Sequence, residues 1–428
     1  MQDPFEKRSV SLFGKRVFFR LFAEKNEVMR KLFLLSLFAL AACEEVELPD
    51  RDREERKIPV EDVARLLSAL PVGTEQVREV LDAVSASVEN GYDEEYMLRD
   101  LFREPGTGVG DAGTRSGAAY AEPLRDLIEA QVRSGSVTRA ASDWSADDYL
   151  AALKSSDLQI YWPYSDATKF SGDLPVITFD PDDGSDANTG WRPVIDEDGS
   201  RRVEEILVDE EFAREHPVWV VNRNDDSAYR TLELLRREDP SWGSGEGGDI
   251  IVGPLRSGWN KAGTRSADGK LRSLILKTFT MKRQFDPWFA GASEFFVKIG
   301  AIDEFYASTE AELQLYQPTI TDFMIVVRRM QLGQPRPFNA MLVSDWTEQL
   351  QSCAFMIIED DGGTQTSWKT EGEVKIKSKT YGFSVNLPFR TRDDIVWRGS
   401  LSRRYFENYS NVTGHFGDVD LVFEVVER

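Results

Sequence analysis

The spacing of apolar residues changes near Asp157, and this change constrains the fold more than any other feature of the chain. Before it, apolar residues recur at steps of three and four, which is the period of a helix packed on one side. After it, they alternate with polar residues, which is the period of a strand. The chain therefore predicts an α+β fold, in which a small N-terminal helical domain is followed by β-rich domains.

The helical domain is expected over residues 58–155. Its predicted helices cover residues 60–70, 74–84, 93–102, 123–132 and a segment that begins at Ser145. Thr74 is placed to cap the second helix. Ser145 and Asp148 form an imperfect capping box at the start of the fifth.

Two β-rich domains are expected next, over residues 156–288 and 289–428. The strands predicted in the first are 159–162, 175–179, 191–195, 203–208, 218–221 and 274–281. Residues 196–200 have the composition of a hairpin turn. In the second domain, strand-like runs at short intervals, without a long helix between them, predict an antiparallel β-sandwich.

An 11-residue apolar run, Leu32–Ala42, follows the basic stretch Met29-Arg30-Lys31 and precedes Cys43. The run is too short for a membrane span, which needs about 20 residues. A basic start, an apolar core and small residues before a cut are the parts of a secretory signal. Here Leu40-Ala41-Ala42-Cys43 resembles the lipobox of bacterial lipoproteins. The resemblance implies that residues 29–42 are a signal peptide and that Cys43 is acylated as the mature N-terminus.

On this interpretation translation begins at Met29, and residues 1–28 are a mis-annotated leader. Residues 43–57 are nearly all charged and predict a solvated stalk. The acidic residues after Cys43 resemble the surface-export signals of Bacteroidota lipoproteins, and the whole chain resembles uncharacterised lipoproteins of that group. This resemblance implies a lipid-anchored protein of the cell envelope, at the outer membrane. The body after residue 57 resembles no characterised family.

The charge of the chain limits its partners. The chain has 52 basic and 74 acidic residues, a net charge of −22. Such a field repels phosphate backbones, which excludes nucleic acid as a partner. It also repels anionic lipid, so contact with the membrane is expected through the acyl chains of Cys43 alone.

An acidic segment follows the strand predicted at residues 175–179. Asp180, Asp182, Asp183 and Asp186 lie within seven residues and could supply several of the oxygens that calcium prefers. The spacing is not that of an EF-hand loop, because the glycine comes too early and the twelfth position lacks a glutamate. A calcium site and a solvated acidic turn are both consistent with this segment, and calcium is the one cofactor that the sequence suggests.

Aromatic residues surround the same segment. Tyr161, Trp162, Tyr164 and Trp191 could stack on sugar rings if their faces are exposed. Alternating aromatic residues in strands are equally typical of a packed core. The four residues are therefore candidate glycan-binding residues, with core packing as the alternative.

Catalytic signatures are scarce. The chain has two histidines, His216 and His415, and contains neither H-E-x-x-H nor the G-x-S-x-G elbow. Cys353 opens the apolar run Cys353–Ile358, which predicts a buried strand and a structural thiol rather than a nucleophile. We therefore expect a non-enzymatic binding or assembly module for a glycan or an envelope protein. A secreted hydrolase that uses carboxylates or a calcium-assisted site is the alternative.

Overall fold

The computed structural model describes residues 57–103, 120–135, 144–168, 173–181, 183–224, 229–238 and 272–427. The signal peptide, Cys43, Asp182 and all of the stalk but Lys57 lie outside these residues. No helix within the described part of the chain is long and apolar enough to cross a membrane.

Four of the five predicted helices are present, as α2 (Val60–Ala69), α3 (Thr74–Glu89), α5 (Leu124–Arg133) and α6 (Ala146–Lys154). Ser145 caps α6 as expected, because its Oγ accepts a hydrogen bond from Asp148 N at 3.1 Å. Thr74 is the first helical residue of α3 and not its cap. Gly73 holds the cap position, and its N–H donates to Gln76 Oε1 at 2.8 Å.

The prediction of a helix over residues 93–102 is wrong. This segment forms β1 (Glu95–Met97), followed by the single turn of α4 (Leu98–Leu101). β1 is buried and pairs antiparallel with β2 (Leu158–Tyr161), so that Tyr96 lies opposite Ile160. Buried peptide groups need hydrogen-bond partners, and pairing with β2 supplies them. This tertiary gain outweighs helix propensity, which differs by less than about 1 kcal/mol per residue among ordinary residues.

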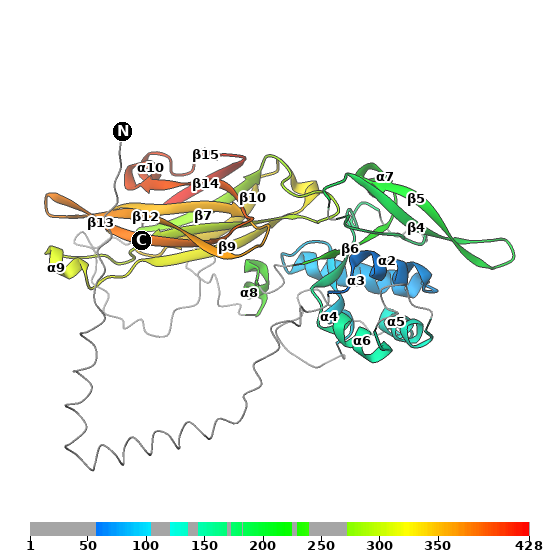
Figure 1. The fold of residues 1–428 in the computed structure, drawn as a ribbon. Coiled ribbons are helices and arrows are strands. Elements are labelled where there is room, and N and C mark those ends of the chain that lie inside the picture. Colours follow the sequence, from blue (N-terminus) through cyan, green and yellow to red (C-terminus); the bar gives the residue numbers. More distant parts are fainter. Residues whose placement is uncertain are drawn as a thin grey trace, which may run out of the picture. The chain divides into compact units, whose positions relative to one another are not determined.

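The first sheet has six strands in the order β1-β2-β6-β3-β4-β5. Its other strands are β3 (Val176–Phe179), β4 (Ala187–Ile195), β5 (Arg201–Asp209) and β6 (Val218–Arg223), and α7 (Glu210–Glu215) precedes β6. β3 and β6 run parallel, whereas the neighbouring pairs are antiparallel. β4 and β5 form the hairpin that the sequence predicts, and it projects from the sheet (Figure 1).

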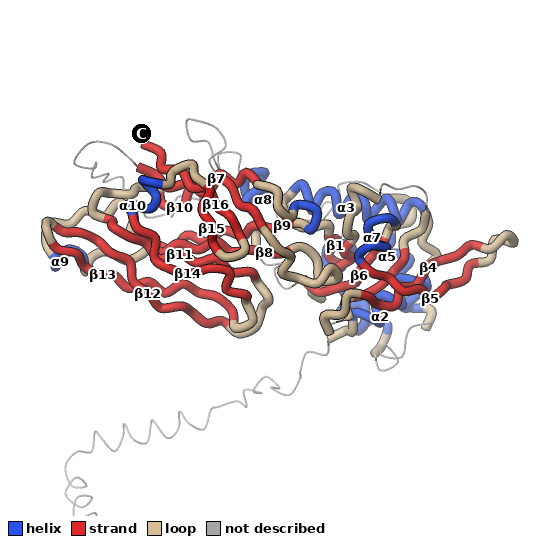
Figure 2. Tube along the Cα trace, turned by 90° about the horizontal axis from the view of Figure 1, so that it is seen from above, coloured by secondary structure: helices blue, strands red, loops and turns tan. Residues whose placement is uncertain are grey.

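The helices and this sheet share one hydrophobic core. Leu67 of α2, Val80 of α3 and Ile128 of α5 belong to the same buried cluster as Ile160 of β2 and Trp219 of β6. The helices lie beside β1 and β6 (Figure 2). The expected separation of a helical domain, 58–155, from a domain that begins at residue 156 is therefore corrected. Each amphipathic helix has one apolar face, and here the sheet covers it.

The rest of the described chain is mostly strand. After α8 (Leu232–Glu238), four strands form one sheet in the order β10-β7-β16-β15. They are β7 (Arg272–Met281), β10 (Arg336–Val343), β15 (Thr413–Phe416) and β16 (Val419–Glu427). The strand predicted at 274–281 thus belongs to this sheet and not to the middle domain, because β7 pairs with β10 and β16.

A second sheet has the order β13-β12-β11-β8-β9, with β14 also paired to β11. Its strands are β8 (Ser293–Ala301), β9 (Thr319–Val327), β11 (Leu350–Glu359), β12 (Gln365–Ile376), β13 (Lys379–Arg390) and β14 (Asp394–Ser402). Three short helical segments lie among them, namely α9 (Glu310–Leu313), η2 (Arg329–Gln331) and α10 (Arg403–Asn408).

Aromatic contacts join these two sheets. Phe279 of β7 packs on Phe295 of β8 with ring centres 4.9 Å apart, and Phe355 of β11 packs on Phe423 of β16 at 5.5 Å. Such pairs between facing sheets are typical of a sandwich core. Neighbouring strands in both sheets are antiparallel. The α+β fold and its antiparallel, sandwich-like sheets are thus confirmed (Figure 1).

Candidate functional site

The four candidate glycan-binding residues are buried. Tyr161 is 1% exposed, Trp162 0%, Tyr164 6% and Trp191 4%. Trp162 packs edge-on against Trp219, and its Nε1 donates to Thr168 Oγ1 at 3.3 Å. Side chains with so little exposed area offer no face to a sugar ring, so the glycan-stacking prediction is corrected in favour of core packing.

The acidic segment after β3 is a turn on the surface. Asp183 and Asp186 are exposed, Asp180 is half-buried, and Asp182 lies outside the described residues. Asp183 accepts a hydrogen bond from Ser185, whose N–H lies 2.9 Å from Oδ1, and bonding to Ser185 lowers the pKa of this carboxyl. Among the described residues, these aspartates do not gather into a group of three oxygens within 4.8 Å. The calcium prediction for this segment stays a prediction.

A different group of acids does converge. Asp286 lies in the loop between β7 and β8, Glu359 is the last residue of β11, and Asp361 is the second residue of the loop to β12. One carboxylate oxygen from each lies within 4.8 Å of the other two, and within the described part of the chain no second group meets this criterion. Three carboxylates at this spacing are positioned to hold a metal ion. We refer to Asp286, Glu359 and Asp361 as the carboxylate triad.

Burial and the neighbouring carboxylates disfavour the ionised form of Glu359 and Asp361. Burial, followed by contact with Asp286, raises the pKa of Glu359 to about 12, and the charges of Asp361 and Asp394 act in the same direction. Burial and the charge of Asp286 raise the pKa of Asp361 to about 6. Asp394 lies opposite Glu359 in the β11–β14 ladder, which places the two side chains on one face of the sheet.

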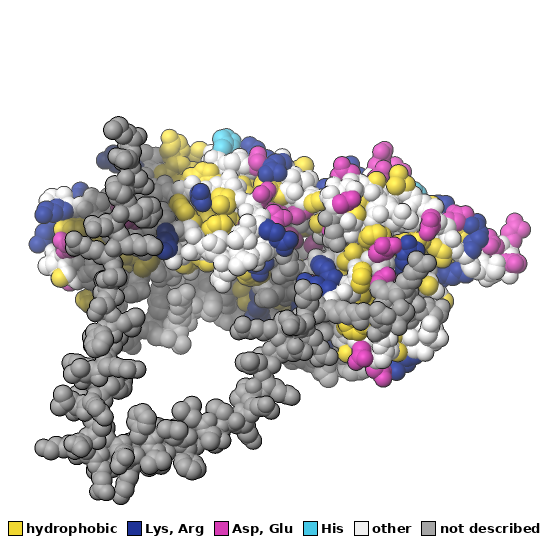
Figure 3. All heavy atoms as spheres, viewed as in Figure 1, with side chains coloured by type: hydrophobic (Ala, Val, Ile, Leu, Met, Phe, Trp, Pro, Cys, Tyr) yellow, Lys and Arg dark blue, Asp and Glu magenta, His cyan; other side chains and the backbone are white. Residues whose placement is uncertain are grey.

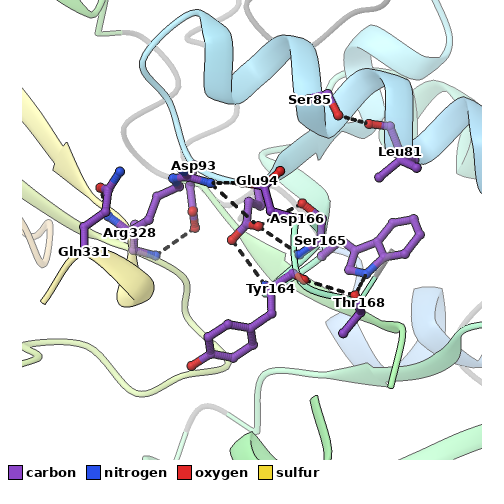
Figure 4. A network of polar contacts seen from close by, with 12 residues as sticks. Leu81, Ser85, Asp93, Glu94, Tyr164, Ser165, Asp166, Thr168, Arg328 and Gln331 are labelled. Atoms are coloured by element: carbon purple, nitrogen blue, oxygen red, sulfur yellow. Dashed lines mark hydrogen bonds and ion pairs between the residues drawn. The ribbon is translucent and has the colours of Figure 1, made fainter. Parts of the chain in front are cut away.

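A second acidic feature is the buried segment Asp93-Glu94-Glu95, which joins the two cores (Figure 4). Glu94 Oε1 accepts hydrogen bonds from Ser165 N at 2.9 Å and from Ser165 Oγ at 2.8 Å. Asp93 Oδ2 accepts one from Ala292 N, at the end of the β7–β8 loop, at 2.8 Å. Burial raises the pKa of Glu94 to about 7 and that of Glu95 to about 8.

These bonds indicate that the segment 93–95 stabilises the fold and does not form a binding site. Each acid is almost fully buried, and the partners are backbone amides and side chains of the neighbouring elements. Local periodicity assigned the segment to a helix. Three consecutive acids shortly before the apolar Met97-Leu98 are the local signal that distinguishes this segment from an ordinary amphipathic helix.

The β4–β5 hairpin carries exposed apolar side chains. Ile195 is 64% exposed, Val203 41% and Leu207 71%. Ile195 pairs with Arg201, two residues before Val203, and side chains two apart on a strand point to the same face. The three apolar residues therefore share one face of the hairpin, on which Arg201 and Glu205 also lie, and we call them the apolar row. Acidic side chains gather at the tip of the hairpin, where Asp196, Glu197 and Asp198 lie (Figure 3).

The opposite face of the hairpin carries ion pairs near its tip, and Ile206 and Val208 lie on it nearer the core. Arg192 pairs with Glu204 at 2.8 Å, and Arg202 pairs with Glu204 at 2.5 Å and with Asp196 at 3.0 Å. The side chains of the apolar row are thus exposed on one face of the hairpin, and ion pairs occupy the other face near the tip. β5 is also the last strand of its sheet among the described residues.

In the described residues, neither histidine forms a catalytic pair with a nucleophilic side chain. His216 is exposed and stacks near Phe212, with ring centres 4.4 Å apart, and His415 is exposed with Nδ1 2.5 Å from Asp420 Oδ1. Cys353 is fully buried in β11, as its sequence context predicts, and its Sγ donates to Leu401 O at 3.6 Å. Burial raises the pKa of this thiol well above its ordinary range, which keeps it protonated and unreactive.

A polar depression of about 670 Å³ lies at one end of the sandwich, between α10 and the strands β11 and β12. Glu373, Lys375, Arg403 and Glu407 are among its lining residues. Charges of both signs are mixed in it, and its lining includes no aromatic ring, so it favours no particular ligand.

Comparison with protein families, with curated proteins and with solved structures finds no match for this chain.

Proposed function

We propose that this chain is a lipid-anchored protein of the cell envelope whose folded body binds a protein partner, without catalysis, through the apolar row of the β4–β5 hairpin. The lipobox-like segment that ends at Cys43 supports the anchor. The apolar row supports the binding role, and it is the observation that carries the proposal.

Exposed apolar side chains that share one face are typical of interaction surfaces, and Glu205 lies among them here. Burying one large aliphatic side chain contributes about 1.5–3 kcal/mol, so a partner that covers the row gains a useful binding energy. Ile195 and Leu207 are each more than 60% exposed, and the ion pairs of Arg192 and Arg202 occupy the other face. A protein fits this surface better than a glycan does, because sugar recognition uses exposed aromatic rings, and the aromatic residues of this region are buried.

The hydrolase alternative receives less support. A carboxylate pair acts on a glycosidic bond only when both groups reach the substrate. Glu359 is 1% exposed, and Asp93, Glu94 and Glu95 are at most 5% exposed. Acids buried to this extent stabilise or destabilise the fold but do not contact a polymeric substrate.

Site-specific photo-crosslinking in intact cells tests the binding role. A photoreactive amino acid at position 207 should produce a specific protein adduct, whereas the same group in place of Arg202, on the opposite face, should not. Val203→Asp combined with the probe at 207 should abolish the adduct. Adducts of equal yield from both faces, or none from position 207, would contradict the proposal, and an adduct with carbohydrate would favour the glycan alternative.

The anchor is tested separately. Wild-type protein should fractionate with membranes and incorporate labelled fatty acid, and Cys43→Ala should do neither. Protease treatment of intact cells then distinguishes the outer face, where the body is cleaved, from the periplasmic face, where it is protected. Retention of the Cys43→Ala variant in the membrane would refute acylation as the anchor.

A further inference from the structure

The carboxylate triad brings together three segments that are far apart in sequence. Asp286 comes from the β7–β8 loop, Glu359 from the end of β11 and Asp361 from the following loop, and their oxygens lie within 4.8 Å of one another. Like charges at this distance repel strongly unless something neutralises them. A buried carboxyl in this position, that of Glu359, therefore needs a bound proton or a bound cation.

Glu359 gives the independent observation that points to a ligand. Its side chain is 1% exposed, neither carboxylate oxygen accepts a hydrogen bond from a donor among the described residues, and its side-chain contact is with another carboxyl, that of Asp286. A buried carboxylate without a partner costs several kcal/mol, and native proteins normally pair such a group or coordinate it to a metal. The oxygens of Glu359 are directed toward those of Asp286 and Asp361.

Basic side chains near the triad are engaged with other acids. Arg390 pairs with Asp360 at 3.2 Å, and Arg283 pairs with Asp418 at 2.7 Å and lies 3.8 Å from Asp394. In the described part of the chain no lysine or arginine forms an ion pair with Glu359 or Asp361. Neighbouring acids are thus paired within the protein, whereas Glu359 and Asp361 have no basic partner among the described residues.

We propose that Asp286, Glu359 and Asp361 bind one hard divalent cation, with calcium as the preferred ion. All three ligands are carboxylate oxygens, which suit calcium, magnesium and manganese and do not suit zinc or copper. Two of the three ligands come from loops, and the flexible coordination of calcium tolerates this better than the strict octahedron of magnesium. Asp361 is exposed and gives the ion a path from solvent, while Glu359 anchors it at the rigid end of β11.

The bound ion would tie the β7–β8 loop to the sandwich. The same loop contacts the first core, because Asn222 Nδ2 donates to Phe289 O at 2.9 Å and Trp288 Nε1 donates to Asp186 O at 2.9 Å. Arg329 Nη1 donates to the carbonyl of Asp286 itself at 3.0 Å. The cation therefore stabilises the loop through which the two cores meet. This inference does not depend on the partner proposed for the hairpin.

Metal content and thermal unfolding of the full chain in detergent test the proposal. After chelation and dialysis against calcium, wild-type protein should retain one ion per chain and unfold at a higher temperature than the chelated protein. Glu359→Gln and Asp361→Asn should each weaken calcium binding at least about tenfold, which is the least expected for loss of a direct ligand. The control is Asp183→Asn with Asp186→Asn in the acidic turn after β3, which should bind calcium as the wild type does.

The outcomes are distinct. Glu359→Gln keeps the size of the side chain and needs neither a proton nor a cation, so in chelator it should be at least as stable as wild-type protein but should gain nothing from calcium. Asp361→Asn, at an exposed position, keeps the test valid if Glu359→Gln fails to fold. No ion bound from calcium, magnesium or manganese at millimolar concentration overturns the proposal. Binding that survives both triad variants and is lost in the control also overturns it, and assigns the ion to the acidic turn.

Discussion

Arg328 Nη1 lies 3.8 Å from Glu94 Oε1, and this ion pair connects the two cores of the described chain. Glu94 lies beside β1 in the first sheet, and Arg328 directly follows β9 of the sandwich. Both side chains are largely buried, at 3% and 16% exposure. The contact between the cores therefore includes buried acidic side chains and the guanidinium of Arg328.

These buried acids predict a pH dependence of stability. Burial raises the pKa of Glu94 from 4.5 to about 7 and that of Glu95 from 4.5 to about 8. Between the ordinary pKa and the raised pKa of each carboxyl, the folded chain binds more protons than the unfolded chain. The free energy of unfolding therefore falls as the pH rises from about 5 to 8. Urea unfolding across this range should show the decline.

Glu95→Gln should flatten the decline and raise stability at pH 9, because the variant keeps an acceptor for Asn224 Nδ2 without the buried charge. Glu197→Gln is the matched control, since it makes the same chemical change at an exposed position in the hairpin turn. A Glu95→Gln profile that parallels the wild-type profile would show that this carboxyl does not titrate in the range.

β8 and β13 lie close together at Gly300, so a larger residue at this position should destabilise the fold. A Cβ added at Gly300 would overlap Val385 Cγ1 and lie 3.4 Å from Leu387 Cδ2. Overpacking of a core costs about 1–3 kcal/mol, so Gly300→Ala should lower the free energy of unfolding by that amount. Adding Val385→Ala should recover part of the loss. A double variant whose loss equals the sum of the two single losses would contradict the contact.

The burial of Trp191 predicts a structural effect and not a ligand effect. Its ring stacks on Phe179 with centres 5.9 Å apart, and the guanidinium carbon of Arg65 lies 4.6 Å above it. Trp191→Ala should therefore cost about 3–5 kcal/mol of stability, measured by urea unfolding. A variant that unfolds like wild-type protein but loses a saccharide ligand would restore the glycan-stacking interpretation.

The thiol of Cys353 should be unreactive in the folded chain. It is 0% exposed, and burial raises its pKa. In the Cys43→Ala background it is the single cysteine, so a thiol-specific disulfide reagent should modify no site in native buffer and one site in denaturant. Rapid modification of native protein would show that β11 opens readily or that the thiol has an activated environment.

Much of the fold follows from local patterns. The capping serine at position 145, the hairpin around residues 196–200 and the buried strand that begins at Cys353 were all predictable, because each depends on neighbours within a few residues. The segment 93–102 was not, because its pairing partner Ile160 lies more than fifty residues away. The boundary expected at residue 156 failed for the same reason.

The carboxylate triad was beyond local analysis. Four strands, β8 to β11, follow Asp286 before the chain reaches Glu359 at the end of β11, and the antiparallel ladder of β8 and β11 brings the two residues together. Sequence alone offered one signal, the acidic run Glu359-Asp360-Asp361 at the end of an apolar strand. That run resembles any solvated turn until the burial of Glu359 is known.

The amino-acid sequence by itself determined four of the five predicted helices, the sandwich-like class of the C-terminal half and the expectation of a lipid anchor at Cys43. These properties depend on periodicity and on short motifs, which are local. Only the tertiary structure decided which aromatic residues are buried, which acids converge and which apolar side chains of the hairpin stay exposed. Those properties depend on contacts between segments that are far apart in the sequence. Such contacts bury side chains, and burial changes the pKa and the solvation free energy of a side chain in ways that its neighbours in the sequence do not reveal.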